Sequence, residues 1–336
     1  MQIQSILKQI SNRQFKPIYL LYGEETYFID QISKALEHTV LTDAQKGFDQ
    51  SILYGKETDL ATVVSVAKRY PMMSDYQLVI VKEAQHLDWK SGSAFLEKYL
   101  NDPMLSTILV FEHRYTKFEK RRKVHKLAEK IGVVLEAKKL YDNQLPGWIG
   151  SYVQTKGWTI EPQATMLISD HLGADLSKVT NEVDKLLMNV PKEKIISAIE
   201  VEANIGISKD FNVFELNNAL SNKNWSRAVQ IVDYFSENPR NHPITRIVGG
   251  LSTHFTKILK YHYLPDKSQA SVAKNLGVHP FFVKDYVTAA RNYGKPQLFR
   301  VIHALQEMDL KSKGVEVGAY TSSRDIYRDF IIDIMR

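Results

Sequence analysis

Short, unbroken apolar runs in the first 140 residues constrain the fold of this chain more than any other feature. Four runs indicate strands and a weaker fifth joins them: residues 17–22, 78–81, 107–111, 132–135 and, more weakly, 51–54. These runs are almost entirely apolar and show no polar alternation, so each strand should be buried on both faces, as in a parallel sheet covered by helices. Helical patterns, such as those at 59–70 and 91–100, lie between the runs. The sequence therefore predicts an α/β domain.

Strand patterns stop after Ala137, and helical patterns take over. Residues 140–156 and 162–172 are typical of helices, and Asp175 is a candidate N-cap for the helix that follows it. The helical pattern breaks near residues 205–208, which indicates a linker.

After this break every pattern is helical to the end of the chain. Pro243 stands where a helix can start, and apolar residues between 244 and 259 form one stripe. The sequence therefore predicts three domains: an α/β domain at 1–140, a small helical domain at 141–207 and an all-helical domain at 208–336.

Length and composition narrow the class of protein. A chain of 336 residues favours two or three domains. No apolar run approaches the ~18–20 residues that cross a bilayer, and the N-terminus lacks the pattern of a signal peptide, so we expect no membrane contact and a cytoplasmic location. The absence of cysteine excludes disulfides and thiolate chemistry. A net charge of +6 is compatible with an anionic partner such as DNA.

The first strand runs into a glycine turn and then a helix, which is where a phosphate-binding loop would lie. That loop needs the pattern G-x-x-x-x-G-K-[ST], because its lysine reaches the phosphates and its hydroxyl holds magnesium. Counted from Gly23, the second glycine, the lysine and the hydroxyl are replaced by Phe28, Ile29 and Asp30. The pattern is absent at all three positions.

The residues of the turn also disfavour a phosphate. They are Gly23, Glu24, Glu25 and Thr26. One carboxylate about 4–5 Å from a phosphate charge costs on the order of 3–4 kcal/mol. The strand at 78–81 is followed by Lys82, where a P-loop ATPase would carry an acidic metal ligand. We interpret the turn as a relic of an ATPase or as a simple strand-to-helix connection, without bound nucleotide.

No other pattern predicts catalysis or metal binding. The ten histidines are scattered, and none belongs to an H-E-x-x-H pair. His254 and His262 share a predicted helix face, but no carboxylate lies at matching spacing. A G-x-S-x-G elbow is also missing. We therefore predict no catalytic residue, no metal site and no cofactor.

Six of the ten residues from 117 to 126 are lysine or arginine. The centre of this run, Lys120, Arg121, Arg122 and Lys123, could lie against a phosphate backbone. The alternative is a solvated helix face with Val124 and Leu127 turned inward, and the sequence favours this alternative.

Residues 271–283, SVAKNLGVHPFFV, match the apolar spacing of a helix-turn-helix. The recognition helix would begin with Pro280, Phe281 and Phe282, whereas base edges are read by Arg, Lys, Asn or Gln. A packing hairpin explains two adjacent phenylalanines better, although a DNA-binding protein remains an alternative.

The segment before the strand at 78–81 begins with Pro71, Met72 and Met73. One methionine could pack under the edge of the sheet. Alternatively, the pair could project from a rigid turn as an adaptable apolar anchor for a partner's pocket. The sequence does not separate these two interpretations.

Taken in order, these features resemble the delta subunit family of bacterial clamp loaders over nearly the whole chain. The resemblance rests on these motifs: LLYGEETYFI at 20–29, YPMM at 70–73, QLVIVKEA at 77–84, LGADL at 172–176, VFELNNAL at 213–220 and AKNLGV at 273–278. It implies a RecA-like, AAA+-type parallel-sheet domain without ATPase activity, then a helical lid and an all-α collar that joins a pentameric ring.

The resemblance also implies a function in DNA replication. The chain would be a non-catalytic subunit of the DNA polymerase III holoenzyme, itself a nucleotidyltransferase. Its partners would be the beta sliding clamp, the ATPase and delta-prime subunits of the loader, and primed DNA. Clamp binding would map onto Met72 and Met73, with Pro71 beside them. The family commonly carries Phe or Leu there, so two methionines are a departure. The alternatives are an active AAA+ ATPase and the DNA-binding protein described above.

Overall fold

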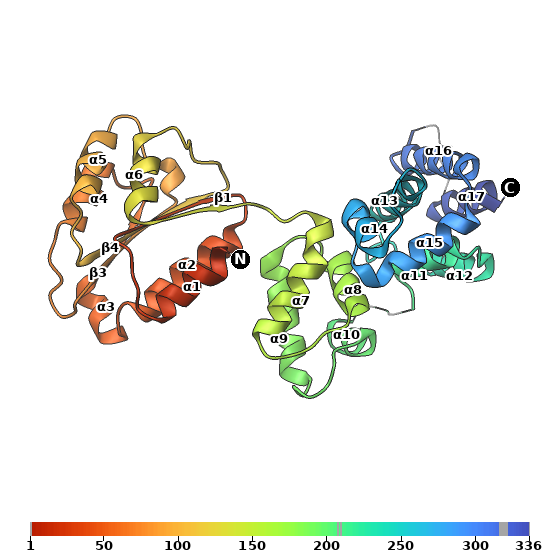
Figure 1. The fold of residues 1–336 in the computed structure, drawn as a ribbon, viewed down its shortest axis with the longest axis horizontal. Coiled ribbons are helices and arrows are strands. Elements are labelled where there is room, and N and C mark those ends of the chain that lie inside the picture. Colours follow the sequence, from red (N-terminus) through yellow and green to blue (C-terminus); the bar gives the residue numbers. More distant parts are fainter. Residues whose placement is uncertain (1, 207, 209, 316–321, 336) are drawn as a thin grey trace. The chain divides into compact units, whose positions relative to one another are not determined.

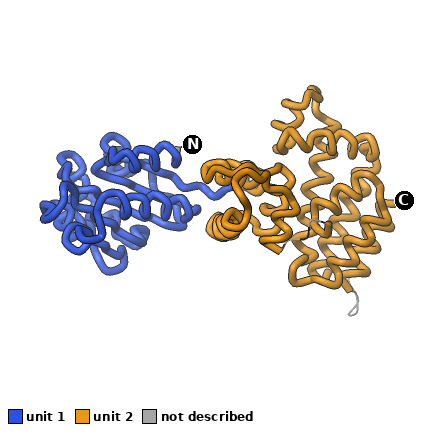
Figure 2. Tube along the Cα trace, turned by 90° about the horizontal axis from the view of Figure 1, so that it is seen from below, with its two compact units in different colours: residues 1–140 blue, residues 141–336 orange. Residues whose placement is uncertain are grey.

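A computed structural model of the chain describes residues 2–206, 208, 210–315 and 322–335. The chain divides into two compact units, Met1–Leu140 and Tyr141–Arg336, which Figure 2 colours separately. Within the described residues, no helix combines the length and the apolar character needed to cross a bilayer.

The first unit is built on a five-stranded parallel sheet. Its strands are β1 (Ile18–Gly23), β2 (Gln50–Tyr54), β3 (Gln77–Lys82), β4 (Thr107–Arg114) and β5 (Val133–Ala137). They lie in the order β2-β3-β4-β1-β5, and every neighbouring pair is parallel. The inner strands β1, β3 and β4 are buried at nearly every position, as their unbroken apolar runs predicted. The edge strands β2 and β5 are more exposed.

Helices cover both faces of this sheet (Figure 1). They are α1 (Gln2–Ser11), α2 (Thr26–Thr39), α3 (Asp43–Asp49), α4 (Leu60–Ala67), α5 (Ser93–Asn101) and α6 (Lys123–Ile131). Side chains of α4, α5 and α6 share one apolar core with alternate residues of the inner strands. Helix α2 packs on the other face, and α1 packs against α2.

Helix α4 is shorter than predicted. The pattern at 59–70 indicates a longer helix, but α4 ends at Ala67 with Lys68 as its C-cap. Pro71 disfavours helical backbone at the residue before it, so the chain leaves the helix before Tyr70 and enters an irregular loop at 71–76.

The described part of the second unit is helical, with one isolated bridge between Ile160 and Ile196. Its helices are α7 (Leu145–Thr155), α8 (Pro162–Leu172), α9 (Leu176–Asn189), α10 (Ala198–Ile205), α11 (Val213–Ser221), α12 (Trp225–Glu237), α13 (Ile244–His262), α14 (Gln269–Leu276), α15 (Val283–Asn292), α16 (Lys295–Ser312) and α17 (Ser323–Met335). Asp175 caps α9 by accepting a hydrogen bond from the Lys178 amide at 3.1 Å.

Helices α11 to α17 contribute to one apolar core. The predicted division of residues 141–336 at 207/208 stays a prediction, and Ile207 lies outside the described residues. The predicted order of a parallel-sheet domain followed by helices is confirmed.

Candidate functional site

The glycine that ends β1 is required by packing. Gly23 adopts φ +136°, and a Cβ atom there would lie 2.2 Å from the carbonyl oxygen of Ala137 on the neighbouring strand β5. Only glycine permits this close approach with that backbone conformation. Packing against β5 therefore explains why position 23 is a glycine, without a bound phosphate.

The N-terminus of α2 is capped from within the chain. Glu25 is 7% exposed, its carboxylate accepts a hydrogen bond from the Tyr27 amide at 3.3 Å, and its own amide donates to Ala137. A helix N-terminus attracts anions, and here the anion is a side chain of the turn itself. Glu24 is exposed and Thr26 is the first residue of the helix.

The three residues that stand where a phosphate-binding loop would have Gly, Lys and Ser/Thr contribute to the core or to an ion pair. Phe28 and Ile29 are buried against the sheet. Asp30 pairs with Arg114 at the end of β4, which also pairs with the buried Glu112 at 2.6 Å. Burial lowers the pKa of Arg114, but the two carboxylates outweigh burial and raise it above its ordinary value. The carboxylates of Asp30 and Glu112 are thus already paired with a cation, the guanidinium of Arg114.

The loop at 71–76 presents its methionines to solvent. Met72 is 77% exposed and Met73 is 55% exposed, while Pro71 is partly buried. Neither methionine packs under the sheet edge, so the core interpretation does not describe them. An apolar pair held outward is expected where a partner covers it.

This loop is fastened to the body of the unit by one buried carboxylate. Asp49, the last residue of α3, is 2% exposed. Its oxygens accept hydrogen bonds from the amides of Met72 (2.5 Å) and Met73 (2.9 Å) and from the hydroxyl of Ser74 (2.8 Å). Burial raises the pKa of Asp49, but these bonds outweigh burial and hold the pKa below its ordinary value. Sequence reasoning missed Asp49.

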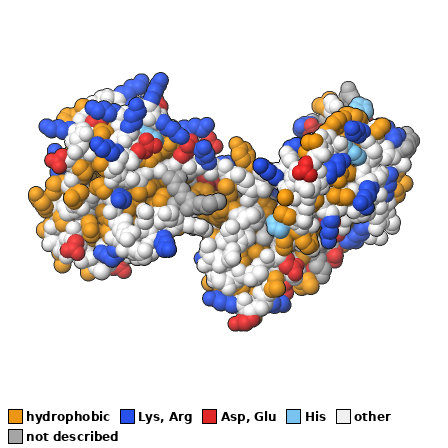
Figure 3. Space-filling model, in the orientation of Figure 1, with side chains coloured by type: hydrophobic (Ala, Val, Ile, Leu, Met, Phe, Trp, Pro, Cys, Tyr) orange, Lys and Arg blue, Asp and Glu red, His pale blue; other side chains and the backbone are white. Residues whose placement is uncertain are grey.

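Two aromatic residues extend the apolar surface. Phe48 precedes Asp49 and is 59% exposed, and Tyr70 precedes Pro71 and is also exposed. We call Phe48, Tyr70, Met72 and Met73 the apolar wedge surface. Figure 3 shows hydrophobic side chains reaching the surface over this region of the first unit. Sequence reasoning also missed Phe48 and Tyr70.

The predicted basic run pairs with acidic side chains. Each of its four central residues lies within salt-bridge distance of a glutamate: Lys120 of Glu136 (2.8 Å), Arg121 of Glu119 (3.4 Å), Arg122 of Glu119 (3.1 Å) and Lys123 of Glu97 (3.1 Å). Val124 is buried and Leu127 packs against the core, as the solvated-face interpretation requires. Contact between this run and DNA stays a prediction.

The helix-turn-helix candidate is used for packing. Phe282 is buried, and its ring lies 5.4 Å from the ring of Phe214 on α11. Lys284, in the first turn of α15, lies over the ring of Phe281 at 5.0 Å. At the start of the would-be recognition helix, Phe282 is therefore used for packing, while Phe281 stays 48% exposed.

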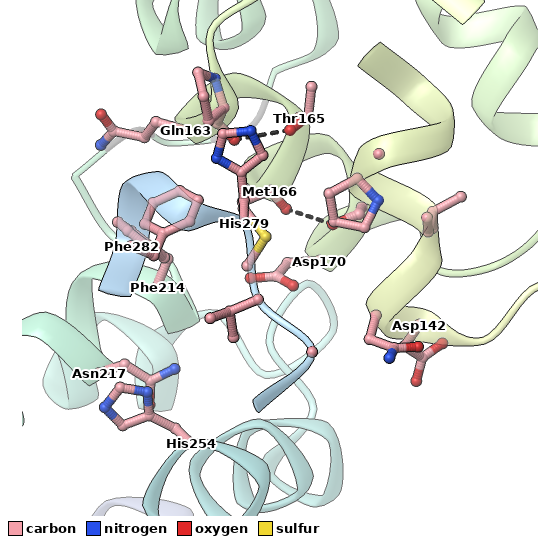
Figure 4. Close-up of a pocket in the computed structure, with 18 of the residues that line it drawn as sticks. Asp142, Gln163, Thr165, Met166, Asp170, Phe214, Asn217, His254, His279 and Phe282 are labelled. Atoms are coloured by element: carbon pink, nitrogen blue, oxygen red, sulfur yellow. Dashed lines mark hydrogen bonds between the residues drawn. The ribbon is translucent and has the colours of Figure 1, made fainter. Parts of the chain in front are cut away.

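The second unit contains a pocket of about 1510 Å³ that brings together Asp170 of α8, Asn217 of α11 and His254 of α13 (Figure 4). His254 Nε2 lies 2.7 Å from the Ser221 hydroxyl. Burial lowers the pKa of His254 to about 3 and raises that of Asp170 to about 6. A general base needs a pKa near the working pH, so this Ser–His pair is poorly suited to activate a nucleophile. Among the described residues, no cluster of three or more His, Asp or Glu could hold a metal ion.

Two family models match the chain. The model for the DNA polymerase III delta subunit matches residues 19–138, and the model for its C-terminal domain matches residues 210–321. The chain is 27% identical over 317 residues to DNA polymerase III subunit delta of Bacillus subtilis strain 168. The matched segment covers 92% of this chain and 91% of that protein. The chain is 23% identical over 309 residues to a probable DNA polymerase III subunit delta of Aquifex aeolicus strain VF5, covering 88% and 86%.

The fold is similar to that of a solved structure, the Bacillus subtilis DNA clamp loader delta protein. The TM-score is 0.55 with 24% sequence identity, and the match covers 99% of this chain and 100% of that one. This similarity confirms the predicted fold class, a RecA-like parallel-sheet domain followed by helices.

Proposed function

The chain belongs to the DNA polymerase III delta subunit family, and from this premise we propose that it binds and opens the beta sliding clamp during DNA replication. The observation that carries the proposal is the exposed pair Met72 and Met73, held outward by a buried carboxylate. Methionine is flexible and polarizable, so the pair can adapt to an apolar pocket of a partner.

The hydrogen bonds that hold the loop support a binding role. A partner that captures a mobile loop must order it, and this ordering reduces affinity. Here the backbone of the loop is already held by hydrogen bonds to Asp49, so less ordering remains. The exposed Phe48 and Tyr70 beside it are residue types enriched at protein interfaces.

Clamp opening would follow from binding alone. A ligand shifts a conformational equilibrium only by its differential affinity for the two states. If the apolar wedge surface fits the open ring better than the closed ring, bound subunit shifts the clamp toward opening. No bond chemistry by this chain is needed.

We also propose that the chain has no ATPase activity of its own. The capping carboxylate of Glu25, the buried Phe28 and Ile29, and Lys82 at the end of β3 all support this. Energy from ATP would then come from the ATPase subunits of a pentameric loader. The ATPase alternative would require a phosphate-binding site that these residues do not provide.

We propose the remaining partners from the membership of the chain in this family. Residues 208–336 would form the collar that joins the ATPase and delta-prime subunits, and residues 141–207 would form a separate lid domain. Primed DNA would be held within the assembly, where the net charge of +6 favours it. As part of a bacterial replication assembly, the protein would act in the cytoplasm.

The test is release of clamp from DNA without nucleotide. Clamp is loaded onto nicked circular DNA, the full chain is added in the absence of ATP, and the clamp that remains bound is followed over time. We expect release to accelerate at least about tenfold, which corresponds to about 1.4 kcal/mol of preference for the open ring. Binding to the clamp without faster release would contradict the opening role, and no binding would contradict the proposal as a whole.

A further inference from the structure

We infer that Asp49 is a positioning residue that fixes the Met72–Met73 loop in its binding conformation before the clamp arrives. The inference rests on the proposed function, because it assigns a role in the same binding surface. Asp49 itself is 2% exposed, so it acts through the loop and does not touch the partner.

In this geometry the two oxygens of one carboxylate face three donors of the loop. Oδ1 accepts from the Met72 amide at 2.5 Å, and Oδ2 accepts from the Met73 amide at 2.9 Å and the Ser74 hydroxyl at 2.8 Å. Gln45, also on α3, adds a weaker contact from its side-chain amide to the Met73 carbonyl at 3.4 Å. Three consecutive residues of the loop are therefore bound to one helix.

An ionised carboxylate is the side chain that this arrangement needs. It only accepts hydrogen bonds, and it offers two oxygens. An asparagine of the same shape offers one acceptor oxygen, and its NH₂ group would face a donor. The Met72 and Met73 amides lie against different oxygens of Asp49, so one of them would then face the NH₂ group and lose its partner at a buried position, which is costly. The Ser74 hydroxyl would keep a second acceptor, the Tyr76 carbonyl at 2.6 Å.

The position of Asp49 is itself fixed relative to the strand that the loop enters. Helix α3 begins at a capping box formed by Thr42 and Gln45. Asp49 is followed directly by β2, whose first residue, Gln50, pairs with Leu78 of β3. The carboxylate is thus held between a capped helix and a paired strand, which makes it a firm support for a loop that leads into β3.

Loss of this support should reduce the fraction of molecules whose loop is ready to bind. Apparent affinity falls in proportion to that fraction. The methionine side chains remain in place after such a change, so the effect of Asp49 should exist only while Met72 and Met73 are present.

The test compares four full-length variants with the parent: Asp49→Asn, Met72→Ala with Met73→Ala, the triple combination, and Asp43→Asn as a control. Asp43 lies on the same helix, is exposed and pairs only with Lys46 among the described contacts. Affinity for the clamp is measured by calorimetry, and amide hydrogen exchange is measured in the free proteins.

We expect Asp49→Asn to accelerate exchange at Met72 and Met73 while exchange in β3 stays close to that of the parent. The thermal midpoint should fall by no more than a few degrees, because the lost hydrogen bond is confined to the loop. Clamp affinity should fall about 10- to 30-fold. In the background without methionines, Asp49→Asn should have no further effect, because the two changes act through one loop. Asp43→Asn should bind like the parent.

The outcomes separate this inference from the proposed function. If the double methionine variant loses affinity and Asp49→Asn does not, the positioning role is wrong and the function stands. The same holds if the effects of Asp49→Asn and the methionine variant are additive. If the methionine variant itself binds like the parent, the proposed function is wrong, while the exchange data still report whether Asp49 orders the loop.

Discussion

The carboxylate of Glu25 accepts a hydrogen bond from the backbone amide of Tyr27 at 3.3 Å, so the N-terminus of α2 holds an anion from its own chain. We predict that the full chain shows no saturable binding of a fluorescent ATP analogue with magnesium below about 100 μM, which corresponds to about −5.5 kcal/mol. Equilibrium titration measures this. Saturation at lower concentration, competed by ATP, would show that the turn still holds phosphate.

The apolar wedge surface provides a prediction with a matched control. Phe48 is 59% exposed next to Asp49, and Phe95 is 57% exposed on α5. Phe48→Ala should weaken clamp binding about 5- to 30-fold, because aromatic residues dominate interface energies. Phe95→Ala removes the same area outside the wedge and should change affinity less than about twofold. Equal losses in both variants would show that Phe48 has no particular role.

Two neighbouring arginines of the basic run differ in exposure and in contacts. The Arg121 side chain is 88% exposed, whereas that of Arg122 is 23% exposed and donates to the Trp89 carbonyl at 2.9 Å. If the run contacts DNA in the loader, Arg121→Ala should reduce the slope of log K against log salt by about one. Arg122→Ala should instead lower the thermal midpoint. An unchanged salt slope in the Arg121 variant would remove it from the DNA interface.

The partly buried carboxyl group of Asp170 predicts a pH-dependent stability. Its pKa is raised to about 6, with Arg246 and Lys257 opposing the rise and Asp142 adding to it. The folded chain therefore holds this proton more tightly than the unfolded chain, so its stabilising effect is present below about pH 4 and is lost as pH rises through 6. Asp170→Asn should raise the thermal midpoint by a few degrees at pH 7.5, and this gain should shrink toward pH 4.5. A gain that does not change with pH would contradict the burial of a charge there.

Much of the fold was predictable because its signals are local. The inner strands each carry an unbroken apolar run, as is typical of strands buried on both faces. Asp175 was recognisable as a cap because its bond to the Lys178 amide spans three residues. The absence of a phosphate-binding pattern after Gly23 could also be recognised from the sequence, because the residues of a phosphate-binding loop have fixed spacing.

The details of the wedge were not predictable, because they depend on contacts between distant segments. The bonds from Asp49 to Met72 and Met73 join residues separated by 23 and 24 positions, and they require α3 and β2 to be placed beside β3. Methionine suits both core and interface, so the exposure of the pair could not be read from its type. The difference between Arg121 and Arg122 likewise depends on Trp89, which lies 33 positions before Arg122.

The central proposal is tested most directly by clamp binding and thermal stability measured on one variant, Met72→Ala with Met73→Ala. Truncation of two anchors at an interface centre costs roughly 3–5 kcal/mol, so affinity should fall on the order of 100- to 1,000-fold. Because both side chains are exposed, the thermal midpoint should stay within about two degrees of the parent. An affinity within threefold of the parent at an unchanged midpoint would contradict the assignment of the clamp anchor to these methionines.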